Sequence, residues 1–391
     1  MKTPWELLKE SKTKIKTTWR IAFVSALVLG LLIHLPVMLS DIPNHDGLSS
    51  MYFDQNMITS GRWFLTVACG FSSYFTIPWV IGLIGLIWLA LTAAVLTEVL
   101  ELTDPVTITV VSGLLVSFPA LASTFAYVFT MDGYMLALFL AVLAVLFTAK
   151  YPRGYLAGAV CLAFSMGIYQ AYLPFTILLC VYKILLYFME EKGWKEKAKY
   201  VCHYLGMGIA GGVLYYVILQ ILLKLQGRVL DTYQGINSME QMGSGMGILA
   251  TIKGMYVDFL AFTVHGNVLV NNIFSLAACI ILVATVVFLV IRSMIWRKWW
   301  KNPAFFVIMI LLGISMPLLT NVILLISPNL TYHLLMRYQW VLYLILMTAF
   351  ADRYTAEESR TDVVLQWAAL CAAVVLVFDY GISDNIGYSN L

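Results

Sequence analysis

The stretch IPWVIGLIGLIWLALTAAVLT at residues 77–97 contains no charged side chain. A helix of about 20 apolar residues crosses the hydrocarbon core of a bilayer, which is about 30 Å thick. Similar runs recur along the 391-residue chain, in which 61% of residues are hydrophobic and 12% are charged. An ordinary soluble domain is about 25% charged and does not expose this much apolar surface. The composition therefore predicts an all-α polytopic membrane protein and excludes a soluble enzyme, a disordered chain and a nucleic-acid binder.

Clusters of charged residues separate the apolar runs and indicate how the chain is organised. We expect a basic cytoplasmic N-terminus at residues 1–20, a multi-span membrane domain at 21–380 and an outer C-terminal tail at 381–391. Two long outer loops are expected at 41–76 and 226–267. About eleven transmembrane helices are predicted, at residues 21–40, 77–97, 106–128, 133–150, 154–169, 172–190, 203–225, 268–291, 304–326, 338–351 and 363–380.

The orientation follows from the positions of lysine and arginine, which are enriched in cytoplasmic loops. With the N-terminus in the cytoplasm and the C-terminus outside, 18 of the 24 basic residues fall on the inner side, five fall outside and Lys183 lies within a span. The inner loops are short, so chemistry is expected at the outer face. Two predicted helical hairpins turn at that face, near residues 128 and 172.

Several motifs are better explained by structure than by cofactors. The six cysteines show no paired spacing, which argues against a disulfide framework or a zinc site. The outer histidines and aspartates lack metal-ligand spacing, so no obligatory metal is expected. Gly206, Gly208 and Gly211 match a dinucleotide-binding fingerprint, but they lie in an apolar helix with no preceding strand, so helix packing is the better interpretation. The glycine-rich residues 242–247 indicate a flexible joint or a lid.

The first outer loop contains the first candidate acid, Asp46. Residues from Asp46 onward have the pattern of a helix lying along the membrane surface. Asp46 is either the N-cap of that helix or a general base held just outside the bilayer. Asp54 lies two turns later, about 12 Å away in a helix, so the two carboxylates need not share a site. Arg62 and Trp63 form either an interfacial anchor or a grip for a phosphate or a sugar face.

Other candidate residues lie at the predicted outer ends of helices. Asp132, at a hairpin apex, is either part of a solvated turn or a functional acid facing a wet cavity. Tyr169 and Gln170 are either interfacial residues or a sugar-binding pair, because aromatic faces and amides suit sugar hydroxyls. Arg337 either extends to lipid headgroups or clamps a phosphate with two hydrogen bonds. His265 lies at the same predicted depth.

These motifs resemble the GT-C superfamily of polyprenyl-phosphate-sugar-dependent glycosyltransferases and, more closely, the GtrII-type bacterial glucosyltransferase family. The resemblance runs from about residue 20 to the end of the chain. It implies a GT-C-like helical bundle in the bacterial plasma (inner) membrane. The motifs that carry it are Asn44-His45-Asp46-Gly47, Gly61-Arg62-Trp63, Asp132-Gly133-Tyr134 and Gly167-Ile168-Tyr169-Gln170-Ala171.

The resemblance also implies an activity: inverting transfer of glucose, or a related hexose, from undecaprenyl phosphate to a cell-surface polysaccharide. Asp46 would deprotonate the acceptor hydroxyl, and Asp132 would orient the acceptor or bind an optional Mg²⁺ or Mn²⁺ ion. Arg337 and Arg62 would stabilise the leaving phosphate. No cofactor is required, and the expected partners are the lipid-linked donor, the polysaccharide acceptor, membrane lipid and a donor flippase. The residues expected to bind sugar or acceptor are Tyr169, Gln170, His45, Asp54, Trp63 and His265.

Two other classes of protein stay open at this point. A lipid-linked-sugar flippase or another polytopic transporter would share the spans, but it would place ionisable residues along a path through the middle of the membrane. Here Lys183 lies within a predicted span, Lys224 lies at the outer end of one, and the acids cluster at outer helix ends, which favours the enzyme. The third interpretation is a structural partner in polysaccharide assembly, whose outer polar residues are all interfacial.

Overall fold

The computed structural model describes residues 2–40, 54–70, 72–74, 77–231, 247–298, 303–327, 330–355 and 359–389. His45 and Asp46 lie outside these ranges. Most of the helix predicted from Asp46 and most of the glycine-rich segment also lie outside them. The described residues 54–57 are not helical, so the predicted helix does not continue past Asp54.

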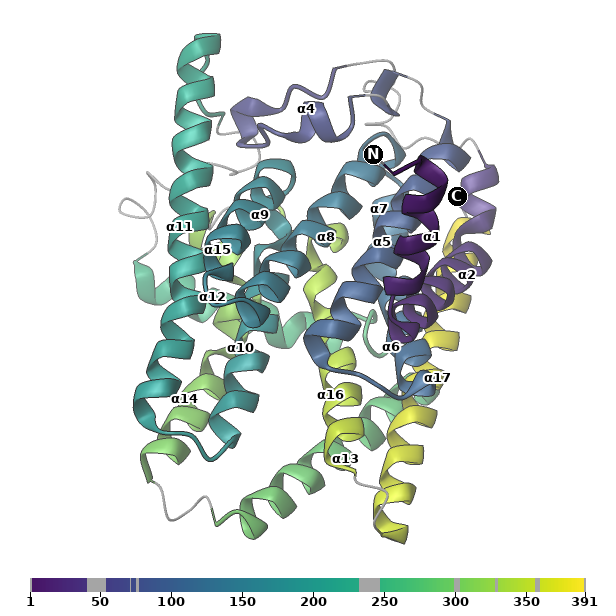
Figure 1. Cartoon of the computed structure of the whole chain (residues 1–391), viewed down its shortest axis with the longest axis vertical. Coiled ribbons are helices and arrows are strands. Elements are labelled where there is room, and N and C mark those ends of the chain that lie inside the picture. The colour runs from purple at the N-terminus through teal and green to yellow at the C-terminus, as the bar shows by residue number, and fades with distance from the viewer. Residues whose placement is uncertain are drawn as a thin grey trace.

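The described part of the chain is helical and contains no β-strand, which confirms the predicted all-α class. Nine of its helices are long and apolar enough to cross a membrane, and the bent pair α6–α7 would make ten (Figure 1). In chain order the helices are α1 (Pro4–Lys14), α2 (Thr17–Leu39), η1 (Ile58–Ser60), α4 (Leu65–Ala68), η2 (Ser72–Tyr74), α5 (Pro78–Leu100), α6 (Pro105–Ser117), α7 (Pro119–Phe125), α8 (Val128–Lys150), α9 (Gly154–Ile168), η3 (Gln170–Tyr172), α10 (Leu173–Met189), α11 (Trp194–Gln226), α12 (Ile248–Leu260), η6 (Ala261–His265), α13 (Ile273–Trp296), α14 (Pro303–Thr320), α15 (Val322–Ile326), η8 (Leu334–Trp340), α16 (Val341–Tyr354) and α17 (Arg360–Ser389).

The core lies where α5 and α8 pack together, with α2 and α9 on either side of this pair. Leu89 and Leu96 of α5 and Leu138 of α8 are fully buried. Gly85 allows the two central helices to approach closely, because a Cβ atom there would lie 3.1 Å from Cγ of Met131. Small residues at such crossings are common in membrane bundles, where van der Waals packing drives helix association.

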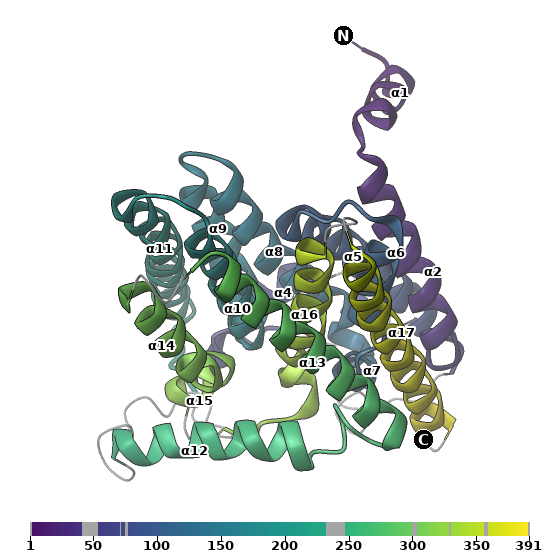
Figure 2. The same cartoon turned by 90° about the horizontal axis from the view of Figure 1, so that it is seen from below.

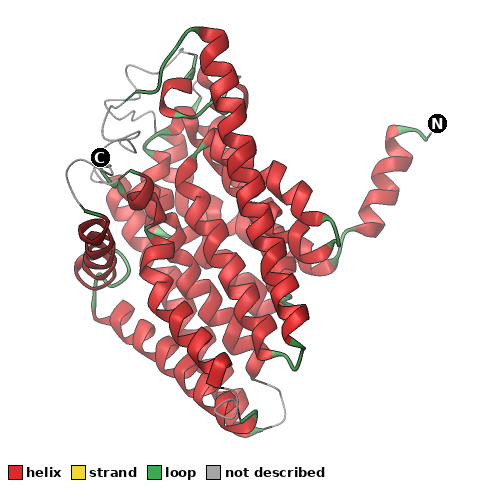
Figure 3. Ribbon diagram, turned by 90° about the vertical axis from the view of Figure 1, so that its left-hand side faces the viewer, coloured by secondary structure: helices red, strands yellow, loops and turns green. Residues whose placement is uncertain are grey.

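The helices at the periphery of the bundle expose apolar side chains. On α11, Leu205, Ile209 and Val213 are all more than half exposed. A contiguous apolar surface of this kind is unfavourable in water and natural in contact with lipid tails. α1 stands away from the bundle, which matches the polar character of the N-terminal residues (Figures 2 and 3).

The hairpin predicted to turn near residue 128 is present, with its turn at residues 126–127. Its first arm is broken at Phe118 into α6 and α7, which are bent by 47°. The second arm begins at Val128, five residues earlier than predicted, so Asp132 lies inside α8 and not in a turn. The carboxylate is buried, with 6% of the residue exposed, and this rules out the solvated-turn interpretation.

Two further segments differ from the sequence prediction. Residues expected to form an outer loop contain α12, which lies lengthwise across the view down the long axis of the bundle (Figure 2). Met255 is buried on its inner side, whereas Leu249 and Val257 are exposed, so the outward face of α12 is apolar, like that of α11. The expected C-terminal tail is the continuation of α17, which extends to Ser389.

The fingerprint-like glycines lie in the middle of α11, so they form a helix and not a nucleotide-binding turn. A Cβ atom at Gly211 would lie 3.0 Å from Leu162 of α9, so this glycine serves close helix packing as predicted. Gly208 and Gly212 have open space around them. The contact therefore depends on one glycine of the set.

Candidate functional site

The candidate site forms where the loop between α2 and α5 folds back on the ends of α8, α9 and α11. Gly61 makes the turn that allows this, with a φ of 79°, a left-handed conformation that suits glycine. A Cβ atom at this position would lie 2.5 Å from the hydroxyl of Tyr215 and 2.6 Å from Nε2 of Gln170. Only glycine therefore fits, and the turn presents the next residue, Arg62, to the helix bundle.

Gln170 and Tyr215 hold the backbone of this turn in place. Nε2 of Gln170 donates to the carbonyl of Ser60 and to the Tyr215 hydroxyl, both at 3.0 Å. The Tyr215 hydroxyl in turn donates to the carbonyl of Gly61 at 3.0 Å. Gln170 is expected to bind sugar, but in the structure its amide group donates to Ser60 and to Tyr215. It therefore positions the turn that precedes Arg62.

Arg62 lies against two tyrosines from different helices. Its Nη1 donates to the hydroxyl of Tyr134 on α8 at 3.1 Å, and its Cζ lies 5.0 Å from the centre of the Tyr169 ring. The two tyrosine rings stack on each other with centroids 4.1 Å apart. Short motifs that are far apart in the sequence therefore meet around one guanidinium group.

The charge of Arg62 is not neutralised within the described residues. No carboxylate among them pairs with it, and its Nε is buried with no hydrogen-bond partner there. Contact with the aromatic faces stabilises the cation by about 1 kcal/mol. A charged hydrogen bond to an anion stabilises it by more than this. The site is therefore electrostatically suited to an anionic group such as a phosphate.

Trp63 anchors the same loop on α9. Its indole ring meets Phe164 edge-on with centroids 5.2 Å apart. A Cβ atom at Gly167 would lie 2.6 Å from the indole, and the Gly167 carbonyl accepts a hydrogen bond from the backbone N–H of Phe64 at 2.7 Å. The indole Nε1 is buried with no hydrogen-bond partner among the described residues.

Asp132 lies beneath the continuation of the loop. Its Oδ1 accepts from the backbone N–H of Gly133 at 2.9 Å, and the side chains of Ser72 and Cys69 lie against the carboxylate. Gly133 is required here, because a Cβ atom would lie 2.3 Å from the Cys69 sulfur. The loop thus contacts the same turn of α8 at two places, through Arg62 at Tyr134 and through Cys69 at Gly133.

Arg337 occupies a separate cluster in which it is already neutralised. Its Nη1 and Nη2 donate to the two carboxylate oxygens of Asp258 on α12, at 2.8 and 2.7 Å. Its guanidinium carbon lies 3.9 Å from the centre of the Tyr332 ring. Nδ2 of Asn321 also donates to Asp258, at 3.1 Å. The expected role of Arg337 as a phosphate ligand stays a prediction, and in this structure the residue holds α12 against η8.

A run of tyrosines connects the two arginine clusters. Tyr169 meets Tyr172 edge-on with centroids 5.3 Å apart, and Tyr172 meets Tyr338 at 6.3 Å. Tyr338 follows Arg337 directly and is almost fully buried. The clusters are thus parts of one packed region, although no described contact joins the two guanidinium groups.

The remaining predicted residues are not brought into this cluster by any described contact. His265 is exposed at the end of η6, and Asp54 is partly buried near the start of the described part of the loop. The described residues contain no group of three His, Cys, Asp or Glu side chains that could hold a metal ion. The optional divalent cation stays a prediction.

Sequence reasoning missed Tyr215 and Asp258, which hold the loop and Arg337 in place. It also missed Asp384, which α17 buries to 5% exposure with its Oδ2 lacking a partner among the described residues. Nothing in the sequence indicates which residues Tyr215, in an apolar helix, and Asp258, in a predicted loop, contact in the fold. Only an apolar periodicity continuing past residue 380 could have drawn attention to Asp384.

Comparison with known proteins gives one match. The sequence matches the family described as Glucosyl transferase GtrII over residues 35–351, which is most of the chain. The matched range includes Arg62, Asp132, Tyr169 and Arg337. No curated protein and no solved structure matches the chain.

Proposed function

The chain belongs to the GtrII glucosyltransferase family, and on this premise we propose that it transfers glucose, or a related hexose, from undecaprenyl phosphate to a cell-surface polysaccharide. The transfer takes place at the outer face of the bacterial plasma membrane. The donor's isoprenoid tail lies among the lipid-facing helices, and a flippase supplies the donor to that face.

The observation that supports a phosphate-bearing donor is the state of Arg62. Removing even part of a cation from water without an anionic partner is costly, and the partly buried Arg62 has aromatic partners but no carboxylate among the described residues. A donor phosphate supplies the missing anion, and arginine binds phosphate oxygens with two parallel hydrogen bonds. Because Arg62 bonds to Tyr134 near the start of α8, a phosphate bound to Arg62 would lie beside the segment that carries Asp132.

The transfer itself is a single displacement with inversion. The acceptor hydroxyl oxygen attacks the anomeric carbon from the face opposite the phosphate, and its proton passes to the carboxylate of Asp46. The bond between the anomeric carbon and the phosphate oxygen breaks, and its electron pair stays on the leaving undecaprenyl phosphate. Arg62 stabilises the charge that develops there. Arg337 joins this role if Asp258 releases it.

The other residues orient the sugar and the acceptor. Asp132 accepts hydrogen bonds from the acceptor, or binds a divalent cation where one is present. Trp63 offers its indole N–H, and Tyr169 offers a ring edge beside Arg62. His45, Asp54 and His265 extend the acceptor side, and Gln170 acts through the loop that it holds.

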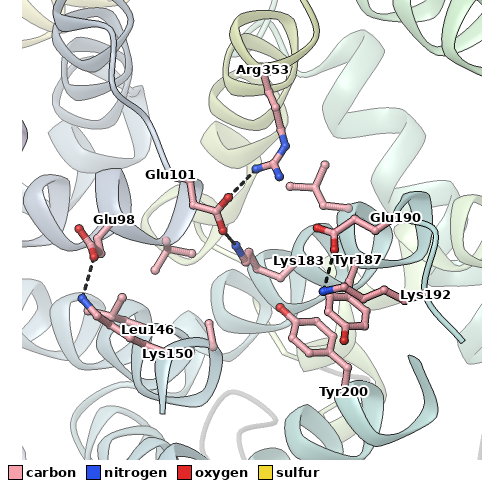
Figure 4. A pocket seen from close by; sticks show the side chains of 13 residues that line it. Glu98, Glu101, Leu146, Lys150, Lys183, Tyr187, Glu190, Lys192, Tyr200 and Arg353 are labelled. Carbon is pink, nitrogen blue, oxygen red and sulfur yellow. Dashed lines mark hydrogen bonds and ion pairs between the residues drawn. The ribbon is translucent and has the colours of Figure 1, made fainter. Parts of the chain in front are cut away.

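The distribution of charge supports the proposed orientation. The N-terminal part of α8 carries Asp132, and its C-terminal residue Lys150 lies about 27 Å away at 1.5 Å per residue. Lys183 and Arg353 line the same cavity as Lys150 (Figure 4). Lys16 shares the Glu98 carboxylate with Lys150. Because basic residues are enriched on the cytoplasmic side, the site around Arg62 faces outward and the N-terminus lies in the cytoplasm.

The proposal is tested by glucose transfer in membranes supplied with undecaprenyl-phosphate-linked glucose and acceptor polysaccharide. The variant Asp46→Asn should lose at least about 100-fold in rate, the contribution of a positioned general base. Glu191→Gln, an exposed acid with no described partner, is the matched control and should keep the wild-type rate. A wild-type rate for Asp46→Asn removes Asp46 from the mechanism. Movement of the lipid-linked sugar across the bilayer without release of undecaprenyl phosphate supports the flippase alternative.

A further inference from the structure

A polar cavity lies at the end of the bundle opposite to Arg62. Its volume is about 340 Å³, and its walls come from α5, α8, α10, α11 and α16 together with the residues that follow α5 and α10 (Figure 4). Neither the family match nor the proposed transfer reaction assigns a role to it. Lys150, which lines this cavity, lies about 27 Å from Asp132 along α8.

The deepest charged group in the cavity is Lys183 on α10. Its side chain is 8% exposed, and its Nζ lies 2.6 Å from Oε1 of Glu101. Arg353 of α16 reaches the other oxygen of the same carboxylate, with Nη1 2.7 Å from Oε2. Two cations from different helices thus converge on one anionic group, while that group itself is 53% exposed. The anion is the least buried member of the triad.

The backbone at Glu101 is an independent sign that its side chain matters. Glu101 follows the end of α5 with a φ of 60°, in the left-handed region. Helices usually end this way on glycine or asparagine, because a Cβ atom makes the conformation costly. A glutamate at this position is explained by what its carboxylate does, which is to occupy the space between Lys183 and Arg353.

The rest of the cavity is lined by both charged and apolar groups. Its basic residues outnumber its acidic residues by four to three. Leu146 and Leu186 line it, and Tyr187 and Tyr200 stack with their ring centroids 3.9 Å apart at its edge. A ligand that matches this lining carries a negative group for the cations and apolar chains for the walls. Membrane phospholipids have this composition, and the helix ends lie at the depth of their headgroups.

We propose that this cavity binds the phosphate of a membrane phospholipid, which takes the place of the Glu101 carboxylate between Lys183 and Arg353. Glu101 then turns outward to water, where half of its side chain already lies. The phosphate gains charge-assisted hydrogen bonds from both cations. Lys150 and Lys192 line the same cavity at 42% and 39% side-chain exposure, and each is paired with its own acid, Glu98 at 2.7 Å and Glu190 at 2.9 Å. The cations that the phosphate would engage are therefore Lys183 and Arg353.

A purely structural role makes a different prediction. If the triad served only to tie α5, α10 and α16 together, removing either the acid or the cation would weaken the fold and leave lipid binding unchanged. If Glu101 competes with phosphate, removing its charge strengthens binding, whereas removing the charge of Lys183 weakens it. The two substitutions therefore separate the interpretations by the sign of their effects.

The test is native mass spectrometry of the full-length protein, purified in detergent and titrated with phosphatidylglycerol. Relative to the wild type, Lys183→Met should bind at least about tenfold more weakly, the loss of one charged hydrogen bond. Glu101→Gln should bind several-fold more tightly. Lys195→Met is the control, because Lys195 is exposed and does not line the cavity. Circular dichroism confirms that each variant is folded, and Glu101→Gln alone decides the matter if Lys183→Met does not fold.

Two ligand arms identify the chemistry that is bound. Diacylglycerol, which has the same chains without phosphate, should not bind with an affinity that depends on Lys183. Inorganic phosphate should not compete at millimolar concentration, because it lacks the apolar chains. Equal binding of diacylglycerol, or unchanged affinity in both Lys183→Met and Glu101→Gln, overturns the proposal. Full competition by inorganic phosphate overturns the lipid source and identifies a site for a soluble phosphate.

Discussion

The turn that precedes Arg62 is held by side-chain hydrogen bonds from Gln170 and Tyr215, so its closure can be weakened by removing one oxygen atom. Tyr215→Phe deletes the hydroxyl that accepts from Gln170 and donates to the Gly61 carbonyl. Only the bond to Gly61 joins the loop to the bundle, and it contributes about 1 kcal/mol net, so its loss lowers the free energy of loop opening by about 1 kcal/mol. An equilibrium shifts tenfold per 1.4 kcal/mol, which makes the open population about 5 times larger.

Arg62 provides a direct readout of that population. It is the only lysine or arginine between residues 41 and 76, so trypsin cleaves this outer loop only after Arg62. When opening is fast relative to cleavage, the cleavage rate follows the open population. Tyr215→Phe should therefore be cut after Arg62 about 5-fold faster than the wild type, and its transfer rate should fall as well. The thermal midpoint of the bundle should change little, because the loop lies at its edge.

The neighbouring residue provides the matched control. Tyr216 lies on the same helix, is 58% exposed and has no described hydrogen bond, so Tyr216→Phe should be cleaved at the wild-type rate. The same cleavage rate for Tyr215→Phe and Tyr216→Phe would refute the conclusion that this hydroxyl holds the loop. Faster cleavage without any loss of transfer would separate the loop from the activity.

Three other sites give predictions that depend on single contacts. Gly133→Ala should destabilise the protein by about 1–3 kcal/mol in denaturant unfolding, because its Cβ would meet the Cys69 sulfur at 2.3 Å; adding Cys69→Ala should recover most of that loss, and no recovery would place the strain elsewhere. Arg337→Met should cost about 2 kcal/mol in the same assay, because it leaves the partly buried Asp258 without its cation; Arg337→Met combined with Asp258→Asn should be less destabilised than Arg337→Met alone. Burial alone would raise the pKa of Glu101, but the hydrogen bonds from Lys183 and Arg353 outweigh it and hold this pKa below its usual value of 4.5. The contribution of the Glu101 carboxylate to the free energy of unfolding is therefore complete above pH 4.5 and is lost as the pH falls through the lowered pKa. Below pH 4.5 the wild type should lose stability more steeply than Glu101→Gln. Parallel profiles of stability against pH for the two proteins would contradict this.

The apolar pattern of the sequence predicted most of the bundle because a helix in lipid must satisfy its own backbone hydrogen bonds. Uncharged runs such as 77–97 correspond closely to α5, which spans Pro78–Leu100. The same pattern did not locate α12, since Lys253, Gly254 and Asp258 interrupt its apolar residues and make the segment resemble a loop. It also placed the start of α8 too late, because a charged residue such as Asp132 is rare inside a helix that buries it.

The candidate site was predictable only in part. The motifs around Arg62, Tyr134 and Tyr169 were each visible in the sequence, and the structure brings them into contact. The partner of Arg337 was not visible, because Asp258 is separated from it by 79 positions and its helix orientation is set by tertiary packing. Position 61 must be glycine because the side chains of Gln170 and Tyr215 lie close to it, and only the folded chain brings them there.

The central claim is that Arg62 binds the phosphate of the donor, and the transfer rate of Arg62→Met tests it most directly. With undecaprenyl-phosphate-linked glucose at limiting concentration, kcat/KM should fall by about 100-fold or more, the loss of a charged group that acts on the transition state. Arg62→Lys should recover part of the rate, because it restores the charge without the planar fork. A wild-type kcat/KM for Arg62→Met in folded protein would contradict the claim.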